Sequence, residues 1–329
     1  MRWVTLAALL AMTPAVPAAP VVLVLVLDGV RADDLGCYGA GAPVSPTIDA
    51  LCASGIVFTR ADAPRSPADT AVVSLLTSRL ASAATADDPT LATVLSGAGA
   101  VTVGITTNAD DESRGRLRGF GTVATVPPEA GAASPSVGFK GADHDAFPLL
   151  FWMQGHRREL RTKAVFLWWR QDVTGLGRLP TPGFLRRFLP PPRAVGLAAV
   201  AQRLLAGEMH FASAEVAQLA AAHEAAIAQA DAALAQVLER LRAADIARRL
   251  WVIVTACTDA ARWEQATGLD DEVRHVPLIV LPPLGGPGPR RSDAPVGLID
   301  LAPTVLSLAG VPAPAEFQGR DLTPILRGQ

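Results

Sequence analysis

The chain has 329 residues, half of them hydrophobic, so it is long enough to bury a sizeable core in one large or two ordinary domains. Lysine and arginine (29) nearly balance aspartate and glutamate (31), for a formal net charge of -2. With no long basic run, this balance argues against nucleic acid or an anionic membrane as a partner and favours a small molecule or a protein. The three cysteines allow at most one disulfide, and we expect Cys37 and Cys52 to fill core space as small apolar residues.

The first 18 residues are typical of a secretory signal peptide. An early arginine, Arg2, precedes a short apolar core from Val4 to Met12, and the small residue Ala18 suits cleavage. The apolar core is too short to span a bilayer, and no cysteine stands near the cleavage point to carry a lipid. We therefore expect an exported protein, periplasmic or secreted, whose residues 19–329 form a single α/β domain. An uncleaved, disordered leader is the alternative.

Residues 21–39 form the most informative segment, in which seven aliphatic residues run without alternation up to Asp28 and a turn follows. An unbroken aliphatic run predicts a strand that is buried on both faces. A charged residue at the carboxyl end of such a strand stands where open α/β sheets bind their ligands. Asp28 is therefore the first candidate site residue.

Strands and helices then alternate along the chain. A serine N-cap, a proline and an acid mark the start of a helix over 66–77. The other predicted helices cover 45–54, 90–97 and 214–244, and the other predicted strands cover 56–59, 100–106, 165–169, 250–255 and 276–281. This alternation predicts a mostly parallel sheet covered by helices.

Several segments resemble the sulfatases, a branch of the alkaline phosphatase superfamily. The match begins at Asp28 with DGVRADDLGCYG and continues in the family's order with PTIDALCASGIVFTRADAP (46–64), SLLTS (74–78), DEVRHVPLIVLPP (271–283) and LIDLAPTVLSLAGVPAPAEFQGRDLTPILRG (298–328). The resemblance implies a three-layer α/β fold with helices on both faces of the sheet, and sulfuric ester hydrolysis as the family's activity. It also implies a site in which strand-end acids and a divalent cation hold the ester beside a nucleophile at a helix N-terminus.

Most of the site residues that the resemblance implies are replaced in this chain. The replacements are Gly29 for the second Asp, Ala68 for the nucleophile, Val72 for its Arg, Thr174 for the central His, and Cys257 with Thr258 for the later Asp-His pair. The downstream Gly-Glu-His-Gly motif and its Lys are also absent. A chain that loses several ligands of a cation is expected to lose the cation.

A shift of two residues in the comparison restores part of this chemistry. Ser66 or Thr70 then becomes a hydroxyl nucleophile, with Ser66 at the helix N-terminus. The alternative roles are an ordinary N-cap for Ser66 and a plain helix residue for Thr70. Asp259 then becomes a metal ligand, although Ala260 follows it where a His or Asn belongs, and the alternative role of Asp259 is that of a solvated loop acid.

Two further groups of residues deserve a chemical interpretation. His144 stands between Asp143 and Asp145 in the one local cluster of the sequence that suits a metal, and a solvated loop is the alternative. Cys257 is a candidate thiol nucleophile at a strand end, but no histidine stands near it in the sequence to activate it.

Three functions are compatible with this pattern. The sequence favours a non-catalytic pseudoenzyme that keeps the sulfatase fold, retains Asp28 as a remnant metal ligand, needs no cofactor, and binds a small-molecule ester or a protein partner. The second is an active hydrolase of sulfate or phosphate esters with an altered site of Asp28, Asp259 and Ser66 or Thr70, which would require calcium, magnesium or zinc. The third is a structural envelope protein.

Overall fold

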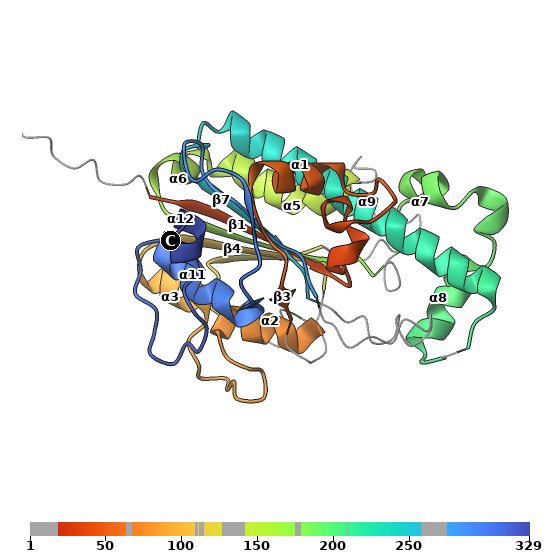
Figure 1. The fold of residues 1–329 in the computed structure, drawn as a ribbon, viewed down its shortest axis with the longest axis horizontal. Helices are drawn as coiled ribbons and strands as arrows, with labels where there is room; N and C mark the ends of the chain where they lie inside the picture. The colour runs from red at the N-terminus through yellow and green to blue at the C-terminus, as the bar shows by residue number, and fades with distance from the viewer. Residues whose placement is uncertain are drawn as a thin grey trace, which may run out of the picture.

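An eight-stranded sheet, in the order β5-β4-β6-β1-β7-β8-β2-β9, forms the centre of the computed structural model (Figure 1). The structure describes residues 19–63, 68–108, 111, 115–126, 142–174, 179–208, 210–257 and 275–329. The strands of the large sheet are β1 (Val21–Asp28), β2 (Ile56–Phe58), β4 (Val101–Thr106), β5 (Thr122–Thr125), β6 (Val165–Asp172), β7 (Leu250–Thr255), β8 (Leu278–Leu281) and β9 (Arg290–Ser292). A separate pair consists of β3 (Ala61–Asp62) and β10 (Val296–Gly297). Within the large sheet only β8 runs antiparallel to its neighbours, which confirms the predicted mostly parallel sheet.

Helices cover both faces of this sheet (Figure 1). One face carries α1 (Pro46–Ser54), α5 (Ala142–Gly155), α6 (Arg157–Thr162) and α9 (Ser213–Ala243). The other carries α2 (Ala68–Thr77), α3 (Leu91–Gly97) and α11 (Leu301–Leu308), and α12 (Thr323–Arg327) ends the chain. The three-layer α/β arrangement is therefore confirmed.

The central strand shows why the aliphatic run is unbroken. All eight residues of β1 are buried, because helices lie on both faces and parallel strands β6 and β7 lie on both sides. A strand in this position has no solvated face, so alternation with polar residues would place polar groups in the core. The carboxyl end of β1 is therefore held rigidly at the middle of the sheet.

The 31-residue helix α9 serves two packing surfaces. Toward the sheet, Asp231 accepts hydrogen bonds from the backbone amides of Thr47 (3.0 Å) and Ile48 (2.8 Å), which caps the first turn of α1. Beyond the sheet, α9 packs with α7 (Pro182–Phe188) and α8 (Leu197–Leu205) around a second, smaller apolar cluster (Figure 1). No helix in the described part of the chain is both long and apolar enough to span a bilayer.

Two predicted strand boundaries differ from the structure by two residues or more. Strand β6 continues past Trp169 to Asp172, because Arg170 and Gln171 are buried although they are polar. Strand β8 begins at Leu278 rather than 276, because the preceding residues pair with the β3 segment instead of the large sheet. The predicted signal peptide and the predicted helix start at Ser66 lie outside the described residues, and the single-domain organisation of 19–329 stays a prediction.

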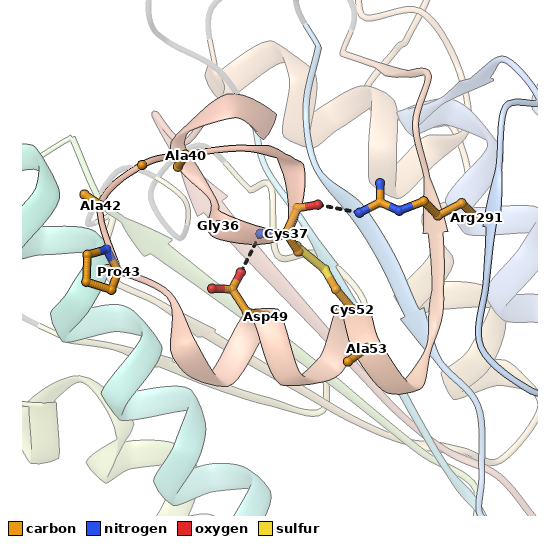
Figure 2. A pocket seen from close by; sticks show the side chains of 10 residues that line it. Gly36, Cys37, Ala40, Ala42, Pro43, Asp49, Cys52, Ala53 and Arg291 are labelled. Atoms are coloured by element: carbon orange, nitrogen blue, oxygen red, sulfur yellow. Dashed lines mark hydrogen bonds between the residues drawn. A yellow bond between two sulfur atoms is a disulfide. The ribbon is translucent and has the colours of Figure 1, made fainter.

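The loop after β1 is tied to α1 by a disulfide between Cys37 and Cys52, so the prediction that these cysteines only fill core space is wrong (Figure 2). The loop turns back because the Cys37 amide donates to Asp49 Oδ1 (2.8 Å) and the Gly36 amide donates to Ser45 Oγ (3.1 Å). The two cysteines are 15 residues apart, and closing a loop of that length stabilises a fold by about 3 kcal/mol.

Candidate functional site

The carboxyl ends of the parallel strands meet at one edge of the sheet, and Asp28 lies at its middle. The strand register pairs Asp28 with Asp172, the last residues of β1 and β6. The Val173 amide donates to the Asp28 carbonyl (3.1 Å), and the Gly29 amide donates to the Cys257 carbonyl (2.9 Å). The ends of β1, β6 and β7, which are far apart in the sequence, are thereby joined at the place where α/β sheets bind ligands.

A buried arginine faces Asp28. Arg170 Nε donates to Asp28 Oδ2 at 2.7 Å, and these side chains are only 1% and 5% exposed. On its other side Arg170 pairs with Asp111, which also accepts from Arg116 Nη1 (3.2 Å) and from Thr106 Oγ1 (2.6 Å). Acid and base thus alternate through Asp28, Arg170, Asp111 and Arg116, which we call the ion-pair row.

Burial raises the pKa of Asp28 to about 8. The Arg170 guanidinium opposes this rise, and the carboxylates of Asp172 and Asp111 add to it. The second carboxyl oxygen, Asp28 Oδ1, is buried and has no hydrogen-bond partner among the described residues. Below about pH 8 Asp28 is therefore a neutral carboxyl bonded to Arg170, and above that pH it forms a full ion pair.

The replacements at Gly29 and Thr174 are coupled in space. Gly29 has a left-handed backbone (φ +81), and a Cβ there would lie 2.7 Å from Thr174 Cγ2 and 3.3 Å from Thr174 Cα. Thr174 is held in place because its amide (3.0 Å) and hydroxyl (2.6 Å) both donate to Asp172 Oδ1. A second aspartate beside Asp28 therefore needs Thr174 to move as well as a strained backbone.

One histidine, His223 of α9, reaches the edge of the sheet near Thr174. Its Nδ1 lies 3.0 Å from the Val173 carbonyl, and its Nε2 lies 3.3 Å from Asp34 Oδ2. Burial disfavours the ionised form of Asp34, but the hydrogen bond and charge of His223, with the Arg31 amide, lower the pKa of Asp34 below its ordinary value. These contacts fasten the end of β6 to the loop after β1.

The described residues around Asp28 do not fit a divalent cation. A hard cation needs several oxygen ligands, whereas Asp28 Oδ2 is bonded to Arg170, its neighbour is a glycine, and Thr174 stands in the remaining space. No group of three or more His, Cys, Asp or Glu side chains that could hold a metal occurs among the residues that the structure describes. The positive charge beside Asp28 comes from a guanidinium instead.

The other predicted site residues are only partly described. Ser66 and Asp259 lie outside the described residues. Thr70 belongs to α2, and for this residue the structure describes the backbone but not the side chain. Cys257 is free of a disulfide but fully buried, so a substrate has no access to its thiol. These assignments stay predictions.

The cluster around His144 is not a loop, so that alternative was wrong. The segment forms the start of α5, and the Asp145 side chain is 6% exposed and accepts a hydrogen bond from Gln229 Nε2 (2.8 Å). The helix forms because residues from 146 onward bring apolar side chains against α9. The structure describes the backbone of His144 and not its side chain.

Three members of the ion-pair row, Arg170, Asp111 and Arg116, were not predicted from the sequence. Arg170 had a signal, because it directly follows the apolar run VFLWW and so stands at a strand end just as Asp28 does. Asp111 follows β4 by five residues within a run of acids, and nothing in that run singles it out.

A cavity of about 580 Å³ lies away from Asp28, beside the disulfide and Arg291 (Figure 2).

Comparison with known proteins identifies the family. The family model for sulfatase matches residues 20–133 and 186–311. Arylsulfatase K of Xenopus laevis is 29% identical over 120 residues, which cover 35% of this chain and 22% of that protein. Arylsulfatase K of Danio rerio is 30% identical over 124 residues, which cover 36% and 23%. The chain therefore matches less than a quarter of the length of these curated relatives.

Solved structures show the same fold at low identity. Phosphonate monoester hydrolase of Agrobacterium radiobacter matches with a TM-score of 0.71 and 18% identity, over 94% of this chain and 77% of that one. A protein solved in complex with its substrate D-glucosamine-2-N,6-O-disulfate matches with a TM-score of 0.68 and 16% identity, over 94% and 80%. Since the family model covers well over half of the residues, the chain belongs to the sulfatase family.

Proposed function

We propose that this chain is a non-catalytic member of the sulfatase family, a pseudoenzyme in which Arg170 takes the place of a divalent cation beside Asp28. One observation carries the proposal, the 2.7 Å contact between the buried Arg170 guanidinium and Asp28 Oδ2. A guanidinium bonded to two carboxyl groups places a positive charge beside them but has no open coordination position for an ester oxygen. Arg170 therefore supports the fold of a sulfatase without its Lewis-acid chemistry.

The coupled replacements support the same proposal. Thr174 fills the space beside Gly29 and is itself hydrogen-bonded to Asp172. These contacts hold the end of β1 against the end of β6. Loss of one ligand alone would leave a damaged metal site, whereas here Arg170 lies between Asp28 and Asp111 and is bonded to both. What remains for function is the binding of a small-molecule ester or a protein partner at this face.

We also propose that the protein is exported to the periplasm or secreted. The disulfide between Cys37 and Cys52 supports export, because such bonds persist in oxidising compartments. Fractionation of the producing cells and N-terminal sequencing test this proposal. An extracytoplasmic protein that begins near residue 19 is expected, and a cytoplasmic protein that retains Met1 would contradict it.

Hydrolysis assays test the proposed function. The purified chain is given an aryl sulfate, an aryl phosphate and an aryl phosphonate monoester, each with added calcium, magnesium or zinc, beside an active sulfatase as positive control. We expect hydrolysis no faster than in buffer. Turnover that disappears in Asp28→Ala would contradict the pseudoenzyme, and its loss in Ser66→Ala or Thr70→Ala as well would establish the altered-site hydrolase.

A further inference from the structure

A groove of about 260 Å³ lies at the edge of the sheet opposite Asp28. It is formed by α6, which leads into the first residue of β6, and by the last turn of α9, which leads toward the first residue of β7. Three arginines and four apolar residues line it: Arg157, Arg161, Arg240, Met153, Leu160, Ala243 and Ala244. We call this the arginine groove.

The floor of the arginine groove is apolar and rigid. Met153 and Leu160 are each 1% exposed and belong to the main core, so their side chains are fixed by packing on the inner side. Arg249 holds the backbone around them, because its guanidinium donates to the carbonyls of Leu160 (3.2 Å), Arg161 and Lys163. The floor of the arginine groove is therefore preformed in the absence of a ligand.

The three arginines have donors that the protein does not use. Arg161 Nε donates to the Ala244 carbonyl (3.1 Å), which leaves its two terminal nitrogens. Among the residues that the structure describes, Arg157 and Arg240 make no side-chain hydrogen bond or ion pair, and no acidic residue lines the groove. A basic residue in the last turn of a helix is favourable in itself, which accounts for Arg240. Arg157 has no such local role, since it is the first residue of α6.

We infer that the arginine groove binds a sulfate or phosphate monoester that carries a short apolar group. Guanidinium groups donate paired hydrogen bonds to tetrahedral oxyanions, and such charge-assisted bonds are strong. The apolar floor accepts an alkyl or aryl group, and the volume lies just below the usual range for ligand pockets, roughly 300–1,000 Å³, which suits a small ligand rather than a polymer. This site is separate from Asp28 and does not depend on the proposed function.

Isothermal titration of the full chain with hexyl sulfate and with hexyl phosphate tests the inference. We expect saturable binding of one molecule, weakened about tenfold or more in the double variant Arg157→Gln/Arg240→Gln, because each lost guanidinium removes charge-assisted hydrogen bonds. The matched control is Arg158→Gln/Arg242→Gln, which changes two exposed arginines of the same helices that do not line the groove. Hexyl sulfate should bind this control as it binds the wild type.

A second variant keeps all three arginines. Ala243→Glu places a carboxylate in the exposed wall of the groove and should abolish binding, while circular dichroism and thermal unfolding stay those of the wild type. Inorganic sulfate and hexanol, which carry only one half of the ligand each, should bind more weakly than hexyl sulfate. No binding of either monoester, equal binding of hexanol, or equal weakening by both double variants would overturn the inference.

Discussion

The two edges of the central sheet use their arginines in different ways. At the carboxyl edge Arg170 is buried and bonded to Asp28 and Asp111. At the amino edge Arg157 and Arg240 are exposed and line a groove without a carboxylate. A buried cation is tolerated only when it is paired, whereas an exposed one is hydrated and free to meet a ligand. At the carboxyl edge, the positive charge of Arg170 is thus paired with acidic side chains. At the amino edge, the positive charges of Arg157 and Arg240 face a groove that no acidic residue lines.

Removal of Arg170 is the strongest way to break this comparison. We expect Arg170→Met to lower the free energy of unfolding by on the order of 3 kcal/mol, because Asp28 and Asp111 lose their buried partner. Urea unfolding followed by circular dichroism measures the loss, which should be larger above about pH 8, where Asp28 is ionised. The exposed Arg158→Met is the control and should stay within about 0.5 kcal/mol of the wild type. Equal stabilities of the two variants would contradict a paired carboxyl edge.

The pH dependence of stability isolates Asp28. Its pKa is about 8 in the folded protein, above the value of about 3.9 for an unfolded chain, so folding favours the protonated form. The stabilising contribution of this proton is complete below about pH 4 and is lost as the pH rises through about 8. The stability of the wild type relative to Asp28→Asn should therefore fall between these limits and level off above them. A difference that does not change with pH would contradict the buried carboxyl.

Substitution of Gly29 tests whether the carboxyl edge is closed to a second acid. Gly29→Ala should cost about 2 kcal/mol more than Gly39→Ala, because both positions have positive φ but only the Cβ at 29 meets Thr174. Thr174→Ser removes the methyl group that makes the closest contact and keeps the hydroxyl bonded to Asp172. The extra cost should shrink in the Gly29→Ala/Thr174→Ser variant. Equal costs at 29 and 39 would show that the edge has room.

The amino edge should show the smallest effect on stability. Arg157→Gln and Arg240→Gln should each change the free energy of unfolding by less than about 0.5 kcal/mol, since neither side chain has a partner to lose in the described part of the chain. Urea unfolding beside Arg170→Met makes the comparison direct. A large loss in either exposed variant would mean that these arginines stabilise the fold and are not held ready for a ligand.

Much of the fold was predictable because burial on both faces leaves a clear sequence pattern. Strand β7 was predicted to its exact ends, and β1 to within its final residue, since their aliphatic runs stop where the strands stop. Strand β6 was predicted too short, because Arg170 is buried through a contact with Asp28, 142 residues away, which no local pattern reports. Asp28 itself was correctly placed at a strand end of the ligand edge, but the group that faces it was not predictable.

The disulfide shows the same limit at shorter range. Cys37 and Cys52 meet because the loop after β1 folds back onto α1 through contacts of its backbone with Asp49 and Ser45. Cysteine spacing alone does not reveal that return, so small apolar packing was an equally good interpretation of the sequence. Coupling between Gly29 and Thr174 was hidden for the same reason, since it depends on strands that pair across more than a hundred residues.

Metal stoichiometry tests most directly whether Arg170 has taken the place of a cation. The wild type and Asp28→Ala are dialysed against calcium, magnesium and zinc in turn, then against metal-free buffer, and the metal bound per chain is measured by mass spectrometry. We predict well under one equivalent, about a tenth or less, in both proteins, because the described residues around Asp28 offer too few oxygen ligands. One equivalent of any of these metals in the wild type, lost in Asp28→Ala, would contradict the replacement of the cation by Arg170.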